Sequence, residues 1–390
     1  MSDNAEQAGW SGSSEEKHMF PCSSCGANLT FKPGADRLEC EYCGNVQMIA
    51  APVQQDTGDD DGDGDGGGGT VAIKEYDFNT ALQEMAQRPA SELVPGGSTV
   101  RCDSCGAETV ISGQSDHCAF CGSPLVVAVE ETGAVLVPES LLSFKLDKRT
   151  AKESYEKWVR KLWFAPNDVK KKAKAQGMDG VYLPYWTYDS ETTTNYVGQR
   201  GEYYYVTESY TDSEGKTKTR RVRKTRWYSP RPGRVHVSFD DVLICASESL
   251  PRKILRALEP WDLEELKPYD PGFLSGFLCE RYKVDLQGGF KLAEERMKPE
   301  IRSTIKSDIG GDTQRILVMN VSHDDVTFKH LLLPVWLSSF RYKEKAYRFV
   351  VNARTGEVQG ERPYSWIKIT LAVLLGIAII AVIVYFSQQQ

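Results

Sequence analysis

Runs of apolar residues divide the chain into a mixed set of helices and strands, so we expect an α+β fold. Between Thr150 and Phe164, the apolar side chains Tyr155, Val159 and Leu162 recur every three or four residues, which is the spacing of one helix face. Short stretches rich in aromatic and β-branched residues are typical of strands. We expect further helices over Asn79–Gln87, Pro166–Ala175, Leu250–Leu258 and Gly289–Ile305. We expect strands over Val181–Tyr188, Tyr203–Val206, Gln314–Val321, His330–Phe340 and Ala346–Val351.

Two similar tetrapeptides lie far apart in this pattern. Leu183-Pro184-Tyr185-Trp186 matches Leu333-Pro334-Val335-Trp336, and an expected helix precedes each of them. Such self-similarity predicts an internal duplication of a helix-plus-sheet unit. The alternative is that a Leu-Pro-aromatic edge strand recurs by chance.

The most apolar run lies near the C-terminus. Ile369–Phe386 is eighteen residues long and carries no charge. At 1.5 Å per residue it spans roughly 27 Å, and with Trp366 and Ile367 it approaches the ~30 Å of a bilayer core. We predict a transmembrane helix over 366–386 and a short tail over 387–390.

The charges around this run predict its orientation. Basic residues such as Arg348, Arg354 and Lys368 precede it, and none follows it. The positive-inside rule then places the large N-terminal part in the cytoplasm, on a single-pass anchor in the cytoplasmic membrane. The polar segment Met1–Lys17 has no apolar core typical of a signal peptide, so we expect no cleaved leader.

Eight cysteines form two groups with nearly the same spacing. Each group reads CxxC, a short gap, then CxxC, and a Gly follows each pair. Two such pairs on a β-hairpin supply four thiolates to one tetrahedral Zn²⁺ ion, whereas a reducing compartment disfavours the alternative of disulfides. Because all four ligands are sulfur, we expect two structural zinc ions rather than catalytic ones. The expected ligands are Cys22, Cys25, Cys40 and Cys43 in one group, and Cys102, Cys105, Cys118 and Cys121 in the other.

These features predict the organisation of the chain. Ribbon 1 is a zinc ribbon over 18–50, preceded by a disordered segment over 1–17. An Asp- and Gly-rich linker over 51–69 and a connector with a short helix over 70–97 follow, and the linker would give ribbon 1 reach. Ribbon 2 is a second zinc ribbon over 98–129, and an α+β cytoplasmic body covers 130–363.

The charge distribution narrows the choice of partners. The net charge is −7, but the first seventy residues carry −10 and the remainder +3. A Zn²⁺ ion with four thiolates adds a formal −2, so both ribbons are anionic and would repel phosphate. We therefore expect the ribbons to contact proteins, with Tyr42 and Phe120 as exposed contact residues, and nucleic acid to be an unlikely partner of the ribbons.

One basic run stands apart from this pattern. Residues 216–226 read KTKTRRVRKTR, and a hairpin tip is expected over Asp212–Gly215. The run is consistent with a solvated hairpin, with a contact to anionic lipid headgroups, or with nucleic-acid binding. The basic side chains concerned are Lys216, Lys218, Arg220, Arg221, Arg223, Lys224 and Arg226.

The sequence contains no recognisable catalytic or cofactor-binding set. His236, His323 and His330 lie in expected strands without an evident nucleophile partner. The pairs Asp240-Asp241 and Asp324-Asp325 are interpreted as turn residues, and Cys245 and Cys279 as buried or free thiols. We therefore expect the protein not to be an enzyme.

Together, the paired CxxCG ribbons, the LPYW-type body and the single C-terminal span resemble the bacterial membrane-anchored TFIIB-type zinc-ribbon proteins of envelope-stress systems. The resemblance implies a membrane scaffold that recruits phage-shock-protein-A-type or SPFH-type partners. Our leading hypothesis is a non-enzymatic membrane adaptor that recruits proteins through its ribbons. The alternative is a membrane-tethered nucleic-acid-binding regulator.

Overall fold

A computed structural model describes most of the chain outside the N-terminal segment and the acidic linker. The described residues are 20–49, 74–87, 98–111, 118–121, 123, 127–128, 136–166, 177–211, 213, 215–342 and 345–387. The expected disorder over 1–17, the linker over 51–69 and nearly all of the helix expected over Pro166–Ala175 lie outside them. Helices and sheets are both present, so the α+β expectation is confirmed.

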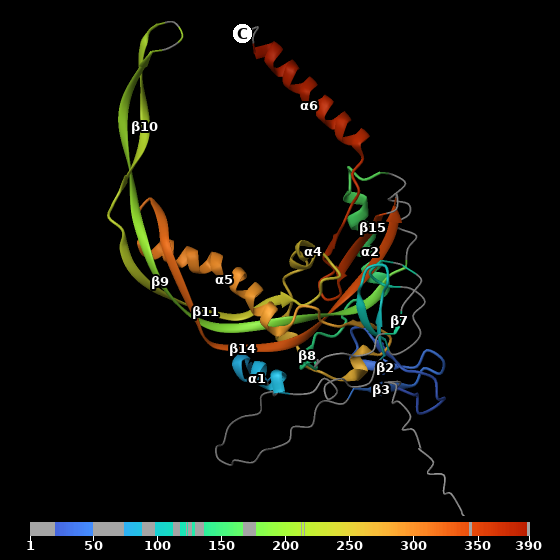
Figure 1. The fold of residues 1–390 in the computed structure, drawn as a ribbon. Helices are drawn as coiled ribbons and strands as arrows, with labels where there is room; N and C mark the ends of the chain where they lie inside the picture. The colour runs from blue at the N-terminus through green and yellow to red at the C-terminus, as the bar shows by residue number, and fades with distance from the viewer. Residues whose placement is uncertain are drawn as a thin grey trace, which may run out of the picture.

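Two long antiparallel strands form the centre of the structure (Figure 1). β9 (Asp179–Thr211) pairs with β14 (Thr313–Tyr342) along most of its length. The separate strands expected over Val181–Tyr188 and Tyr203–Val206 are therefore one strand. The same correction applies to Gln314–Val321 and His330–Phe340. The polar residues between them pair across the sheet, with a bulge in β14 between Asp324 and Thr327, so each chain segment continues in the same direction.

Shorter strands flank this central pair in the described part of the chain. The outer edge of β9 pairs with β13 (Leu278–Glu280), β11 (Arg231–Cys245) and β10 (Thr217–Trp227). The outer edge of β14 pairs with β4 (Tyr76–Asp77), β8 (Ser140–Leu141) and β15 (Lys345–Asn352). The sheet is completed by β12 (Lys267–Pro268), β16 (Val358–Gly360), β5 (Ser98–Arg101), β6 (Glu108–Ile111) and β7 (Val127–Ala128).

Some helices of the described residues differ in length from expectation. α1 (Phe78–Gln87) and α2 (Lys148–Lys161) lie where the pattern placed them, and α5 (Leu286–Ile309) is longer than expected. The helix expected over Leu250–Leu258 shortens to α4 (Arg252–Arg256), which begins directly after a proline. Two 3₁₀ turns, η1 (Leu263–Glu265) and η2 (Pro271–Leu274), follow. α5 runs along β9 and β11 (Figure 1) and buries Ala293, Met297, Ile301 and Ile305 at helical spacing.

The expected duplication is present in the hydrogen bonds of the two Leu-Pro motifs. The indole Nε1–H of Trp186 donates to the carbonyl of Val284 at 2.9 Å, and that of Trp336 donates to Leu146 at 2.9 Å. Each carbonyl belongs to the residue before the aspartate that caps α5 or α2. Each tryptophan thus anchors the helix of the other unit.

The backbone around these motifs repeats in the same way. The amide of Ala246 donates to Pro184 at 2.9 Å, and the amide of Ala353 donates to Pro334 at 3.1 Å. The two motifs also face each other, since Leu183 is the register partner of Leu333. The repeated unit is therefore β8–α2–β9–β11 in one copy and β13–α5–β14–β15 in the other, with β10 as an addition to the first.

The last helix, α6 (Trp366–Ser387), stands away from this sheet (Figure 1). It is long and apolar enough to cross a membrane, and none of its apolar stretch is buried against the rest of the protein. Most of its large apolar side chains are exposed. The composition of α6 thus matches the expected membrane span.

Candidate metal centres and charged surfaces

Four cysteine sulfurs gather at one end of ribbon 1, whose small sheet contains β1 (Thr30–Lys32), β2 (Arg37–Glu39) and β3 (Val46–Met48). The Sγ atoms of Cys22 and Cys43 are 3.5 Å apart, as are those of Cys25 and Cys40. A tetrahedral ion with bonds of about 2.3 Å has sulfur–sulfur edges of about 3.8 Å, whereas a disulfide joins sulfurs at about 2.05 Å. The spacing therefore suits one tetrahedral metal ion and no disulfide.

Ribbon 2 repeats this geometry. The Sγ atoms of Cys102 and Cys121 are 3.5 Å apart, and those of Cys105 and Cys118 are 3.7 Å apart. In each ribbon all four sulfurs lie within 4.8 Å of one another. All eight expected ligands are thus brought together as two groups of four, and sulfur-only tetrahedral sets are typical of zinc.

Glycine turns hold the cysteines in this arrangement. In three of the four CxxCG turns, the Gly N–H donates to the carbonyl of the cysteine four residues earlier over 2.7–2.9 Å. The φ angles of these glycines are 71–74°, a region that glycine adopts without a Cβ clash. The three glycines are Gly26, Gly44 and Gly106; Gly122 lies outside the described residues.

Nearby hydrogen-bond donors favour the thiolate form of some of the sulfurs. Burial alone would raise the pKa of Cys22, but backbone N–H donors, that of Ser24 first, outweigh it and lower this pKa to about 6. The hydrogen bond from Cys118 lowers the pKa of Cys105 to about 5. Sequence reasoning missed Asn45, whose side-chain amide donates to Cys22 Sγ at 3.5 Å. Such donors around a sulfur stabilise a metal-bound thiolate.

The two groups differ in their access to solvent. In ribbon 1, Cys25 and Cys43 are exposed. In ribbon 2, Cys105 is half-buried and its three companions are buried. Water and chelators therefore reach the first group more easily than the second.

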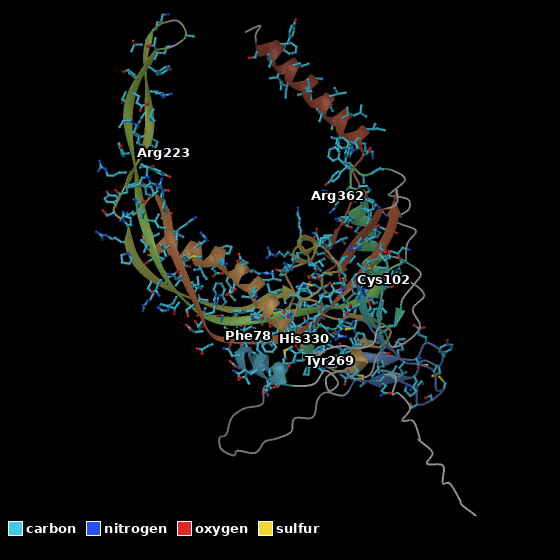
Figure 2. All side chains as sticks on the ribbon, in the orientation of Figure 1. Phe78, Cys102, Arg223, Tyr269, His330 and Arg362 are labelled. Carbon is cyan, nitrogen blue, oxygen red and sulfur yellow. The ribbon has the colours of Figure 1, made fainter. Side chains whose placement is uncertain are left out.

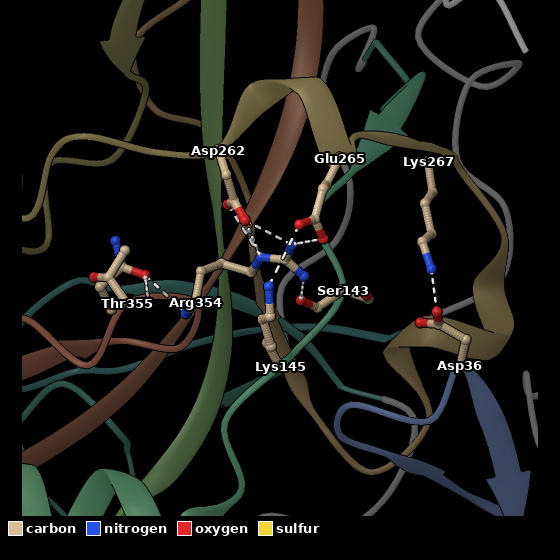
Figure 3. A network of polar contacts seen from close by, with 9 residues as sticks. Asp36, Ser143, Lys145, Asp262, Glu265, Lys267, Arg354 and Thr355 are labelled. Carbon is tan, nitrogen blue, oxygen red and sulfur yellow. Dashed lines mark hydrogen bonds and ion pairs between the residues drawn. The ribbon is translucent and has the colours of Figure 1, made fainter. Parts of the chain in front are cut away.

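Ribbon 1 is docked on the body rather than hanging from the linker. The ring of Phe31 lies 5.3 Å from that of Phe273, and its amide donates to the carbonyl of Ser275 at 3.0 Å. An ion pair joins Asp36 to Lys267 at the same contact (Figure 3). Ribbon 1 therefore does not have the independent reach that we expected from the linker, because its apolar face completes a core shared with the body.

Ribbon 2 is joined to the body even more closely. Its strands β5 and β6 belong to the large sheet, through the pairing of Thr109 with Glu280. Phe120, which we expected to be an exposed contact residue, is fully buried in the core that ribbon 2 shares with the body. Tyr42 in ribbon 1 is 86% exposed, as expected. The difference arises because the body covers the second CxxC turn of ribbon 2, whereas the corresponding turn of ribbon 1 faces solvent.

A buried arginine connects several segments of the body near the ribbons (Figure 3). Arg354 lies in the turn after β15 and binds both oxygens of Asp262 over 2.7–3.1 Å. It also pairs with Glu265 and donates to the carbonyl of Ser143 at 3.1 Å. The network therefore joins three separate segments of the chain.

The basic run forms half of a long two-stranded hairpin, residues 201–227, which we call the arm. β9 and β10 pair here from Gly201 and Trp227 to Thr211 and Thr217, and the arm projects from the body (Figures 1 and 2). Arginines of β10 lie over exposed tyrosines of β9: Arg221 is 4.3 Å from the Tyr205 ring and Arg223 is 4.2 Å from the Tyr203 ring. Such contacts order the arginines while leaving charge at the surface.

The paired aspartates are not turn residues. Asp240-Asp241 and Asp324-Asp325 lie within β11 and β14, at register shifts on either side of β9. Asp241 and Asp325 both have φ of 49°, which an aspartate tolerates better than most residues. They form bulges where we expected turns.

One of these bulges belongs to a buried charge cluster that sequence reasoning missed. Asp189 accepts a hydrogen bond from the Asp241 amide at 2.5 Å, and burial raises the pKa of Asp189 to about 6. Lys329, almost fully buried, pairs with Asp241 at 2.9 Å and with Glu75 at 3.0 Å. The sequence held no signal for this cluster, because its members are far apart along the chain.

The remaining candidate residues have structural surroundings. The Nδ1–H of His330 donates to the carbonyl oxygen of Leu136 at 3.0 Å, and burial lowers the pKa of this imidazole to about 4, so the ring is neutral. Nδ1 of His236 lies 3.1 Å from the hydroxyl oxygen of Thr193, and Nε2 of His323 lies 3.8 Å from a carboxylate oxygen of Glu294. Cys245 and Cys279 are free, half-exposed thiols, as expected, and burial of their sulfurs raises each pKa to about 12.

Comparison with known proteins yields one informative match. The chain is 25% identical to the uncharacterized protein YdjG of Bacillus subtilis (strain 168) over 234 residues. The match covers 59% of this chain and 65% of YdjG, which is just under two thirds of that relative. No family model and no solved structure matches the chain.

Proposed function

We propose that this protein is a non-enzymatic membrane adaptor that recruits protein partners through its zinc ribbons. The observation that carries the proposal is that both four-cysteine groups are fixed to the body that leads to the candidate span: ribbon 1 is docked on it, and ribbon 2 is part of its large sheet. A metal ion in either group would have four sulfur ligands and no free position for water or substrate, as in structural sites. The ions then stabilise surfaces and perform no reaction.

The partner-binding surface in this proposal is the outer side of ribbon 1. Tyr42, Val46 and Met48 are all exposed there, although the rest of the ribbon core is well buried. Val46 and Met48 lie on β3, an edge strand of the small sheet, and an unpaired edge with apolar side chains favours association with another chain. The surface is small, rigid and held by metal.

The membrane side of the proposal comes from α6 and its flanking charges. Arg354 and Arg362 precede α6 and Lys368 lies in its first turn, so the ribbons and body lie in the cytoplasm. The resemblance to envelope-stress zinc-ribbon proteins suggests phage-shock-protein-A-type or SPFH-type proteins as the partners. Recruitment would then bring these proteins to the cytoplasmic membrane.

The arm supplies a second contact, which we assign to anionic lipid headgroups. Seven basic side chains lie on it, and a Lys or Arg near an anionic membrane surface contributes about 1 kcal/mol. The anchor keeps the arm near such a surface at all times. The same charges favour the second candidate function, nucleic-acid binding. That function predicts that the arm binds DNA or RNA in the absence of lipid.

A co-purification experiment tests the adaptor role. The full chain is extracted in detergent with a phage-shock-protein-A-type protein, and Tyr42→Ser/Met48→Ser is compared with Tyr210→Ser, which changes an exposed tyrosine on the arm. We expect the ribbon variant to lose the partner while retaining two zinc ions per chain, and the arm variant to keep it. Equal recovery of the partner with all three proteins would contradict the proposal.

A further inference from the structure

A second set of aromatic side chains lies at the base of α6. Trp163 and Phe164 follow α2 in a tight turn whose neighbours Leu162 and Ala165 are buried. Trp163 is 75% exposed and Phe164 is also exposed, which is unusual for two consecutive large aromatic residues. The turn is held by its own backbone, with the Ala165 amide donating to Leu162 at 3.2 Å.

Hydrogen bonds fix this turn to the first turn of α6, two hundred residues later in the chain. The Ser365 amide donates to the carbonyl of Phe164 at 2.8 Å. The Lys368 ammonium donates to Ala165 O at 2.8 Å and to Trp163 O at 3.3 Å. Trp163 and Phe164 are therefore held at the level where α6 begins.

The surroundings of the turn have the composition of a membrane interface. Trp366 is 81% exposed, and Tyr364 is exposed with Arg362 stacked 5.5 Å from its ring. Figure 2 shows Arg362 beside the base of α6. Tryptophan and tyrosine collect at the headgroup level of bilayers, and flanking basic residues bind the anionic headgroups.

We propose that the Trp163–Phe164 turn is a second membrane-contact element that inserts into the lipid interface beside α6. This inference rests on the proposed membrane anchoring by α6. Insertion at two points, α6 and the turn, fixes the tilt of the body against the bilayer, whereas α6 alone would leave the body free to swing about residues 361–365. We assign lipid as the binding partner of this surface. A protein bound there instead would keep lipid away from Trp163.

Tryptophan quenching by lipid tests the proposal on the full chain. The protein is reconstituted in vesicles of phosphatidylcholine with bromine on the upper part of the acyl chains, which quenches tryptophans near the interface. Among the described tryptophans, Trp186, Trp261 and Trp336 are buried, and Trp158 and Trp227 are half-buried. Trp163 and Trp366 are largely exposed and lie at the base of α6, so they should dominate the quenched emission. Trp163→Phe should therefore remove about half of the emission that the brominated lipid quenches.

Two matched variants make the outcome decisive. Trp158→Phe changes a tryptophan of α2 that packs against Phe349, and it should leave the quenched emission unchanged. Trp366→Phe reports on α6 itself. If Trp366→Phe lowers quenching and Trp163→Phe does not, the turn lies outside the lipid and the inference is wrong. If neither variant lowers it, α6 is not in the bilayer and the proposed anchoring fails as well.

Discussion

Single charged side chains hold together distant parts of this protein. Lys329 lies inside the sheet between Glu75 and Asp241, and Arg354 lies between Asp262 and Glu265. A buried charge is tolerated only when it is paired, so removing either cation leaves carboxylates partly buried and uncompensated. These residues are expected to matter for stability rather than for any reaction.

The Lys329 cluster predicts a pH-dependent loss of stability. Lys329→Met should lower the free energy of unfolding by about 2–3 kcal/mol at pH 8, because it leaves partly buried carboxylates without a cation. The pKa of Asp189 is already raised to about 6, so its folded form takes up a proton more readily than its unfolded form. The deficit against wild type should therefore shrink as the pH falls through 6 and below.

Guanidinium unfolding in detergent at pH 8 and pH 5, followed by tryptophan fluorescence, measures the difference in unfolding free energy between Lys329→Met and wild type. Lys224→Met is the control, because Lys224 pairs with Glu208 on the exposed arm and such pairs contribute about 0–1 kcal/mol. A deficit that is the same at both pH values would show that the carboxylates are not the cause.

At the scale of elements, the two ribbons have the same local geometry but different surroundings. Both contain four cysteines at similar spacing, yet ribbon 1 forms its own small sheet and ribbon 2 is part of the large one. The exposed ligands of ribbon 1 are Cys25 and Cys43, whereas the body covers most of ribbon 2. Their metal sites should therefore differ in lability.

Chelation should accordingly release metal in two steps. We expect two zinc ions per chain, with the ion of ribbon 1 lost first to a chromogenic chelator, because exchange requires access to the ligands. The Cys25→Ser variant should hold one ion and show only the slow step. Release of both ions from wild type in one step would contradict the difference in access.

The duplicated unit predicts that two tryptophans have equivalent roles. Trp186→Phe and Trp336→Phe should each lower the free energy of unfolding by about 2–3 kcal/mol, since each leaves a carbonyl before a helix without its donor and opens a small cavity. Trp366→Phe, at an exposed position, should change it by less than about 0.5 kcal/mol. Chemical denaturation compares the three, and a neutral effect at only one of the two motif positions would argue against equivalence.

At the scale of the whole molecule, the arm and α6 project from the body, whereas ribbon 1 is docked on the body and ribbon 2 is part of its large sheet (Figure 1). The basic arm gains little from packing, because a two-stranded hairpin is marginally stable by itself. Its cross-strand tyrosine–arginine contacts and its root, where Arg315 lies 3.8 Å from the Trp227 ring, keep it extended. An extended, charged arm is suited to an anionic surface.

Trypsin digestion tests this contact, since the arm contains many cleavage sites. In reconstituted vesicles that contain phosphatidylglycerol, cleavage in the arm should be several-fold slower than in pure phosphatidylcholine, and added salt should restore it. Cleavage at the exposed Lys306 of α5 serves as the internal control. Protection by added DNA in pure phosphatidylcholine would favour the nucleic-acid alternative, and equal cleavage under all conditions would favour a solvated arm.

The sequence by itself determined the features that depend on local spacing. The CxxCG turns specify two four-sulfur groups because each turn places its two cysteines within a local motif of a few residues. The uncharged C-terminal run specifies a helix long enough to span a bilayer. The repeated Leu-Pro motifs indicated the duplication, because both copies kept the tryptophan that anchors the opposite helix. Helical spacing likewise located α2 and α5.

Only the tertiary structure decided the features that depend on partners far along the chain. Phe120 is buried and Tyr42 is exposed because the body packs on one CxxC turn and not on the other. Strands expected to be separate are continuous in β9 and β14 because the polar residues between them pair across the sheet, with an aspartate bulge in β14 in place of a turn. In the Lys329 cluster, Lys329 pairs with Glu75, which is more than 250 positions away. Burial and charge pairing are properties of the packed sheet, so local pattern could not specify them.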